Sequence, residues 1–170
     1  IQVDATFQDE CGNPGSCSWT FTTETEPLDC EEIDPVCENL QPPPDTIDVP
    51  IDAIISFDAV DPPVLNDPLI IQSGVVIESV TIDVQVGANP AERVFEVIGG
   101  VPRFIDEYGF SFYTVLPVRK GFMFTLFHNT PWPYNTVITV TSAFRDVCLN
   151  TGGCTWTFTT EEEPPIEEPD

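Results

Sequence analysis

Basic residues are scarce in this sequence, which has five Lys and Arg against 29 Asp and Glu and a formal net charge of −24. A chain of this charge repels the phosphates of nucleic acids and the anionic headgroups of membranes. Apolar runs are also short, because none approaches the roughly 20 residues that a membrane-spanning helix requires. The sequence therefore predicts no nucleic-acid partner and no membrane partner.

Histidine is almost absent, and the single His128 ends an alternating Phe-rich segment. Nucleophilic catalysis needs a Ser or Cys beside a base such as His, whereas this position favours a packed or surface ring. Carboxylate pairs that hydrolyse glycosides need a fixed geometry, and most carboxylates here lie in Pro-rich segments that are poor at providing one. We predict no catalytic residues and a protein that is not an enzyme.

Apolar residues, by contrast, are plentiful enough to form a core. Hydrophobic residues make up 41% of the chain, and 12 residues are Phe. A disordered acidic tail lacks such material. We therefore expect a folded domain in spite of the charge.

The N-terminal segment returns near the C-terminus. Residues 1–27 align with residues 138–164 without a gap, and both copies carry the run Trp-Thr-Phe-Thr-Thr-Glu. The other matched residues are Ile1, Val3, Phe7, Asp9, Cys11, Asn13, Gly15 and Cys17 with Ile138, Val140, Phe144, Asp146, Cys148, Asn150, Gly152 and Cys154. The period is about one domain long, so residues 1–27 are interpreted as the end of a preceding repeat.

The six cysteines form three close pairs along the chain, which are Cys11/Cys17, Cys30/Cys37 and Cys148/Cys154. Zinc sites usually combine closer cysteine spacings with His or further Cys, so disulfides are favoured over a metal site or free thiols. Disulfides in turn predict an oxidising, extracellular compartment. Each pair is expected to cross-link the base of its own hairpin loop, which stabilises a fold by about 2–3 kcal/mol.

Period-two alternation of apolar residues predicts the strands. The first strand of the domain holds one phase from Val49 to Ala59, and the next run over 80–86, 94–98, 110–116, 122–126, 138–144 and 156–158. About seven strands with turn residues between them, and no convincing helix, predict an all-β, immunoglobulin-like antiparallel β-sandwich. Trp156 is expected to anchor its core.

Two Pro- and Glu-rich stretches, 24–48 and 161–170, are interpreted as linkers, because proline stiffens a chain and like charges extend it. The predicted organisation has three parts. Residues 1–27 are the C-terminal strands of a preceding Ig-like repeat, residues 28–163 are a complete Ig-like β-sandwich domain, and residues 164–170 are an acidic, Pro-rich linker to the next unit.

The two ends of the 28–163 unit resemble a known family. The residues that carry the resemblance are Val49-Pro50-Ile51-Asp52, Pro133-Tyr134-Asn135-Thr136, Asp146 and Asn150 in a loop, and Trp156-Thr157-Phe158-Thr159-Thr160. The unit looks like the bacterial Ig-like repeats of large secreted, cell-surface and phage structural proteins. The resemblance implies a spacer, stalk, adhesive, capsid or tail-fibre role, with no catalytic residues to carry over.

One loop residue departs from that family. Leu149 stands where the family has Gly, whereas the first copy keeps Gly12-Asn13. Gly tolerates positive φ and Leu does not, so we expect the turn to be altered.

Acidic residues crowd the junction between the two copies. Glu24, Glu26, Asp29, Glu31 and Asp34 supply the hard oxygen ligands that Ca²⁺ takes, with Asp9 or Asp146 in the adjoining loops. Calcium bound there would rigidify an array of domains. No D-x-D-x-D-G loop is present, so a solvated acidic surface is the favoured interpretation, and no other cofactor is predicted.

The segment 104–113 is rich in aromatic residues. Phe110 and Phe112 share one face of the predicted strand and are expected to be buried, whereas Tyr113 lies on the other face. Binding surfaces favour Tyr, so Tyr108 and Tyr113 are candidates for a glycan or receptor site. Core packing explains most of these aromatic residues equally well.

The half repeat needs a partner, since an isolated hairpin is marginal in water. It either completes an upstream domain of the same polypeptide or inserts into an identical neighbouring subunit, a contact that propagates head to tail. The sequence therefore predicts a non-enzymatic structural repeat of an extracellular fibre, filament or surface protein. The alternatives are an adhesin that binds a glycan or receptor and a component of a phage virion.

Overall fold

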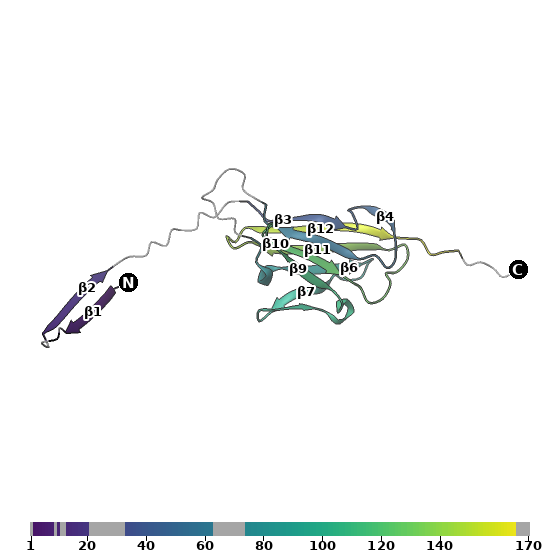
Figure 1. The fold of residues 1–170 in the computed structure, drawn as a ribbon. Coiled ribbons are helices and arrows are strands. Elements are labelled where there is room, and N and C mark those ends of the chain that lie inside the picture. Colours follow the sequence, from purple (N-terminus) through teal and green to yellow (C-terminus); the bar gives the residue numbers. More distant parts are fainter. Residues whose placement is uncertain (1, 9, 11–12, 21–32, 63–73, 166–170) are drawn as a thin grey trace.

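The fold is built almost entirely from strands (Figure 1). The computed structural model describes residues 2–8, 10, 13–20, 33–62 and 74–165. Within them the helical elements are two single turns of 3-10 helix, η1 (Ile77–Ser79) and η2 (Asp106–Tyr108). The strands are β1 (Gln2–Gln8), β2 (Pro14–Thr20), β3 (Val36–Gln41), β4 (Thr46–Val49), β5 (Ile55–Val60), β6 (Thr81–Val86), β7 (Glu92–Ile98), β8 (Val101–Phe104), β9 (Phe112–Leu116), β10 (Gly121–Leu126), β11 (Val137–Arg145) and β12 (Thr151–Thr160).

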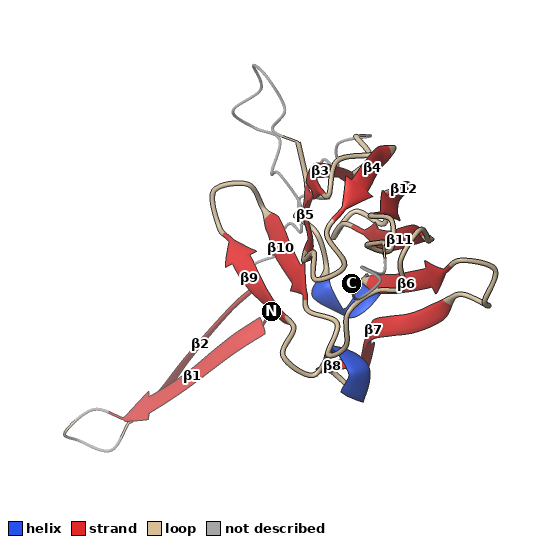
Figure 2. Ribbon diagram, turned by 90° about the vertical axis from the view of Figure 1, so that its right-hand side faces the viewer, coloured by secondary structure: helices blue, strands red, loops and turns tan. Residues whose placement is uncertain are grey.

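Strands β3 to β12 form two sheets that face each other as a sandwich (Figure 2). The smaller sheet has the order β3-β5-β10-β9 and the larger sheet has the order β4-β12-β11-β6-β7-β8. Neighbouring strands run antiparallel, except that β4 lies parallel to β12. The prediction of an all-β sandwich is confirmed.

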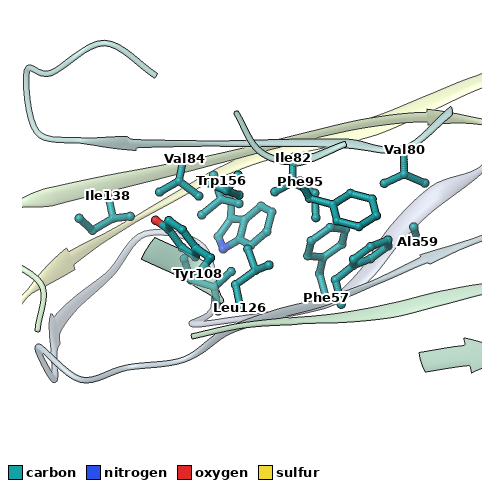
Figure 3. Packing of buried hydrophobic residues seen from close by; sticks show 14 of the residues in the cluster. Phe57, Ala59, Val80, Ile82, Val84, Phe95, Tyr108, Leu126, Ile138 and Trp156 are labelled. Atoms are coloured by element: carbon teal, nitrogen blue, oxygen red, sulfur yellow. The ribbon is translucent and has the colours of Figure 1, made fainter. Parts of the chain in front are cut away.

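The core lies between the two sheets (Figure 3). Phe57 of the smaller sheet stacks on Phe124, with ring centroids 5.3 Å apart, and meets the edge of Trp156 from the larger sheet at 5.5 Å. Phe95 of the larger sheet packs edge-on against Phe124 at 5.1 Å. Trp156 is buried, as the sequence alternation predicts.

Alternation predicts the central strands well because their two faces meet different surroundings. In β11, Ile138, Val140, Ser142 and Phe144 are buried while the residues between them are more exposed. In β6, Ile82 and Val84 follow the same rule. These strands contribute one face each to the core.

The strand predicted from Val49 to Ala59 is wrong, because this segment forms two strands in different sheets. Val49 ends β4, the chain turns at 51–52, and β5 begins at Ile55. Pro50 has no N–H for a strand ladder, and its carbonyl instead accepts a bond of 2.9 Å from the N–H of Ala53. The apolar phase continues across the turn because both strands face the same core from opposite sides.

The linker predicted over 24–48 is also wrong in part, because it contains β3 and most of β4. Strand β3 is an edge strand of the smaller sheet and pairs with β5, while β4 is an edge strand of the larger sheet. Charged residues such as Glu38 are common on sheet edges, where they protect unpaired backbone groups. Strand β8, another edge strand, was likewise not predicted.

The hairpin predicted within the first 23 residues is present as β1 and β2. These two strands hydrogen-bond to each other and form a sheet of their own. Figure 1 shows this hairpin outside the sandwich.

Among the described residues, no helix has the length and apolar character that crossing a membrane requires.

Candidate assembly site

A disulfide joins the two sheets at the start of the domain. Cys37 in β3 of the smaller sheet bonds Cys154 in β12 of the larger sheet, with Cα atoms 5.9 Å apart at a sequence separation of 117. The predicted pairings of Cys30 with Cys37 and of Cys148 with Cys154 are therefore wrong. The bond fastens an edge strand that has little apolar surface of its own.

The hairpin register explains why a local Cys148–Cys154 bond does not form. Ser142, not Cys148, lies opposite Cys154. Cys148 lies in the turn beyond Thr151, and three strand residues from Thr151 to Cys154 already span about 10 Å. A disulfide needs Cα atoms within about 7 Å, so Cys154 takes a partner from another strand.

Cys148 is also disulfide-bonded. Two further cysteines, Cys11 and Cys30, lie outside the described residues. Cys17 is a free and exposed thiol, so the predicted disulfide between Cys11 and Cys17 is wrong.

A glycine lets the segment before β3 approach β12 closely. A Cβ atom added at Gly152 would lie 1.9 Å from the carbonyl oxygen of Pro35 and 3.0 Å from the ring of Phe144. Any larger residue there would push this edge of the smaller sheet away from the larger sheet. Gly152 therefore belongs to the same junction as the Cys37–Cys154 disulfide.

An ion-pair cluster holds the other side of β3. Arg119 donates to Asp58 Oδ2 at 2.5 Å and to Glu38, and Asn39 Nδ2 donates to the same Asp58 oxygen at 2.8 Å. Asp58 is buried, so these donors replace the water that its carboxylate loses. Strand β3 is thus fixed by charge pairing on one side and by the disulfide on the other.

The hairpin β1–β2 repeats the pairing of β11–β12. Val3 pairs with Trp19, Ala5 with Cys17 and Phe7 with Gly15. In the sandwich, Val140 pairs with Trp156, Ser142 with Cys154 and Phe144 with Gly152. All seven pairs of β1–β2 have a counterpart at the aligned positions, so the sequence match extends to strand register.

The two hairpins differ in what covers them. The ring of Phe144 is 3% exposed in the core, whereas the aligned Phe7 is 61% exposed. Strand β11 lies between β12 and β6, and β12 lies between β11 and β4, whereas β1 and β2 have no other strand beside them among the described residues. At this aligned position the N-terminal hairpin exposes a phenylalanine that the C-terminal hairpin buries.

Asp146 and Asn150 hold the loop of β11–β12, in which Leu149 stands. The carboxylate of Asp146 accepts bonds from the backbone N–H and the side-chain amide of Asn150, at 2.9 and 2.8 Å. Leu149 adopts φ +71°, a left-handed conformation that costs a non-glycine residue free energy. Leu149 therefore takes the backbone conformation that favours glycine, and the aligned Gly12 lies outside the described residues.

His128 takes part in an aromatic cluster at one end of the sandwich. Its ring stacks on Trp132 with centroids 4.3 Å apart, its Nδ1 contacts the carbonyl of Thr130, and Tyr108 meets it edge-on at 5.1 Å. These residues line a pocket of about 270 Å³ with Glu92 and Glu107, and the described residues around it include neither Ser nor Cys. His128 is therefore a half-buried ring packed on Trp132, where the sequence predicts a packed or surface residue.

The two candidate ligand-binding tyrosines do not form an exposed face. Tyr108 is buried, and burial raises the pKa of its hydroxyl, with the nearby charges of Glu92 and Glu107 acting in the same direction. Tyr113 packs against the core rings of Phe95 and Phe124, at 6.1 and 6.0 Å.

The predicted burial of Phe110 and Phe112 is wrong, since Phe110 is 80% exposed and Phe112 is also exposed. Phe110 precedes β9 in the turn after η2 and is therefore not part of the strand alternation. Within β9, Tyr113 takes the core-facing position, so Phe112 falls on the outer face. The exposed aromatic residues are thus phenylalanines rather than tyrosines.

The calcium hypothesis rests mainly on residues that lie outside the described part of the chain, namely Glu24, Glu26, Asp29 and Glu31. Asp34 is described and exposed. The described residues contain no group of three or more His, Cys, Asp or Glu placed to hold a metal ion. Asp146 is buried and bonded to Asn150, so its carboxylate serves the loop.

Comparison with known proteins yields little. No protein-family model matches the sequence, and no curated protein matches it. A solved structure described as Astrotactin-2, a conserved vertebrate-specific and perforin-like membrane protein involved in neuronal development, is similar at 15% identity and a TM-score of 0.39. The match covers 94% of this chain and 24% of that chain.

The inter-sheet disulfide is the main feature that sequence reasoning missed. A usable signal was present, because the alternation of β11 and β12 sets a register that leaves Cys148 in the turn and Cys154 within the strand. The partner, Cys37, lies in a segment whose acidic composition resembles a linker. Because of this acidic composition, the sequence did not predict β3, the strand that carries Cys37.

Proposed function

We propose that this chain is a non-enzymatic structural repeat of an extracellular fibre, filament or surface protein, in which Ig-like β-sandwich units follow one another in tandem. The observation that carries the proposal is the correspondence of β1–β2 with β11–β12. The two hairpins share their sequence pattern and their pairing register. Such correspondence is expected when one supersecondary unit recurs along a polypeptide.

The covalent and electrostatic features support the same role. A disulfide between the sheets suits an oxidising compartment outside the cytosol. It also attaches the edge strand β3 to the larger sheet, and without it this strand would separate first when the chain is stretched. The net charge of −24 favours solubility and keeps successive units apart.

The hairpin β1–β2 requires strands from elsewhere in this role. They come either from a further repeat of the same polypeptide or from an identical subunit that joins head to tail. Both arrangements make a linear assembly, because each unit leaves a hairpin to be completed at one end.

The experiment that tests the proposal is electron microscopy of the intact polypeptide as it is purified from its source. A row of beads spaced at about one domain length, roughly 35–45 Å for a sandwich of this size, is expected. A single compact particle without periodic spacing would contradict the proposal.

A second candidate function is adhesion, and exposed apolar residues favour it. Phe110 and Val118 lie almost fully in solvent, and Phe112 and Val115 are exposed on β9, a free edge of the smaller sheet. Exposed apolar clusters on a sheet edge are typical of interaction surfaces. A glycan array and a receptor panel test it: loss of binding in Phe110→Ser supports adhesion, and no binding by the unaltered protein rejects it.

A further inference from the structure

We infer that β1 and β2 are the last two strands of a second sandwich, completed by an Ig-like repeat that precedes Ile1 in the same polypeptide. We further infer that Cys17 forms a disulfide with the cysteine of that repeat at the position of Cys37. The inference rests on the proposed tandem function and names the partner of its unpaired hairpin.

The complete sandwich shows what such a hairpin requires. Strand β6 pairs antiparallel with β11, β4 pairs parallel with β12, and β3 is tied to β12 through the Cys37–Cys154 disulfide. All three of these strands precede β11 in the chain. A preceding repeat therefore has the order of elements that the β1–β2 hairpin needs.

The hairpin retains the features that make this junction. Cys17 occupies the aligned position of Cys154 and is free and exposed. Gly15 occupies the position of Gly152, where the absence of a side chain admits the backbone of the segment before β3. Phe7 occupies the position of Phe144, which the completed core buries.

A second copy of this chain does not offer the same partner. Its β4 and β6 are already paired with its own β12 and β11. Its Cys37 is already bonded to Cys154. The occupant must be a repeat that has strands equivalent to β3, β4 and β6 and lacks the last two.

The covalent step is an oxidation of two thiols. The S–H bonds of Cys17 and of the partner cysteine break, one S–S bond forms, and two electrons and two protons leave. The oxidant is a protein or small-molecule disulfide of the secretory compartment, which is reduced to two thiols.

The first test maps disulfides in the intact polypeptide, with free thiols alkylated before non-reducing digestion and mass spectrometry. A Cys17 peptide linked to a peptide from before Ile1 is expected. Alkylated Cys17, or Cys17 linked to any cysteine within residues 1–170, would overturn the inference. Mixing isotope-labelled and unlabelled protein during expression identifies links between molecules, and a mixed-isotope link would overturn it as well.

The second test separates strand completion from the disulfide. Amide hydrogen exchange in β1 is compared between the intact polypeptide and the 170-residue chain. Completion predicts exchange at least about tenfold slower in the intact polypeptide, also in Cys17→Ser, because paired strands exchange only by opening. Equal rates would overturn the inference.

The two tests also keep this inference apart from the proposed function. Beads in electron micrographs together with alkylated Cys17 and unprotected β1 leave the tandem function standing and reject this partner. Absence of beads rejects the function regardless of the disulfide map.

Discussion

The disulfide between Cys37 and Cys154 should contribute more to stability than any bond across a local hairpin. A cross-link stabilises a protein by restricting its unfolded chain, and the effect grows with the logarithm of the loop that it closes. For a sequence separation of 117 residues, the chain-entropy relation gives about 5 kcal/mol, against about 2.5 kcal/mol for a loop of seven or eight residues. The Cys37–Cys154 pairing and a local pairing therefore predict different losses of unfolding free energy when the disulfide is removed.

The experiment compares Cys148→Ser with the triple variant that adds Cys37→Ser and Cys154→Ser. The Cys148→Ser background removes the second disulfide, which would otherwise restrict the unfolded chain as well. Remaining free thiols are alkylated in the folded protein before unfolding, so that no exchange occurs. The control is Cys17→Ser, which removes an exposed free thiol and should change stability by less than about 0.5 kcal/mol.

The assay is equilibrium unfolding in urea, followed by Trp fluorescence. The triple variant should lose about 5 kcal/mol of unfolding free energy. Its m-value should rise because the unfolded chain expands when the cross-link is absent. A loss of about 2.5 kcal/mol or less would fit local pairing of Cys30 with Cys37 and refute the reasoning.

Three further predictions concern single side chains. Trp156→Ala should lower the unfolding free energy by about 3–5 kcal/mol because the indole fills the core. The control Phe110→Ala should change it by less than about 0.5 kcal/mol, and similar losses for the two variants in urea unfolding would contradict the core assignment. Leu149→Gly should stabilise the protein by roughly 0.5–1 kcal/mol, because it relieves the left-handed backbone at an exposed position; a lower melting temperature would count against this. Burial raises the pKa of Tyr108, so the hydroxyl ionises more easily in the unfolded state than in the folded state, and the unfolding free energy should fall as pH rises above about 10, by up to about 1.4 kcal/mol per pH unit. Tyr108→Phe should flatten this part of a stability–pH curve, and an unchanged slope would show that the hydroxyl titrates freely.

Features that depend on neighbouring residues were accessible from the sequence. Alternation located β6, β10, β11 and β12, because each has one face in the core and one face outside it. The matched segments 1–27 and 138–164 predicted the hairpin of β1 and β2. Trp156 was placed in the core by the same alternation.

Edge elements were not accessible in this way. Strand β3 can lie in an acidic segment because an edge strand makes few contacts with the core and therefore needs few apolar residues. The break between β4 and β5 was hidden because both strands face one core, so the apolar phase runs unbroken through the turn. The sequence predicts Phe110 buried and Tyr113 on the outer face, and the structure shows the reverse, because β9 begins only after η2 and Phe110 precedes it.

The sequence by itself determined that this protein is a β-sandwich with a second copy of its closing hairpin, since strand periodicity and repeated residues are local properties of the chain. Only the tertiary structure decided how the copies use their cysteines. A disulfide depends on which strands meet across the fold, and Cys154 meets Cys37 because β3, an edge strand of the smaller sheet, lies close to β12 of the larger sheet. The alignment of Cys17 with Cys154 is the basis of the disulfide partner that we infer for it.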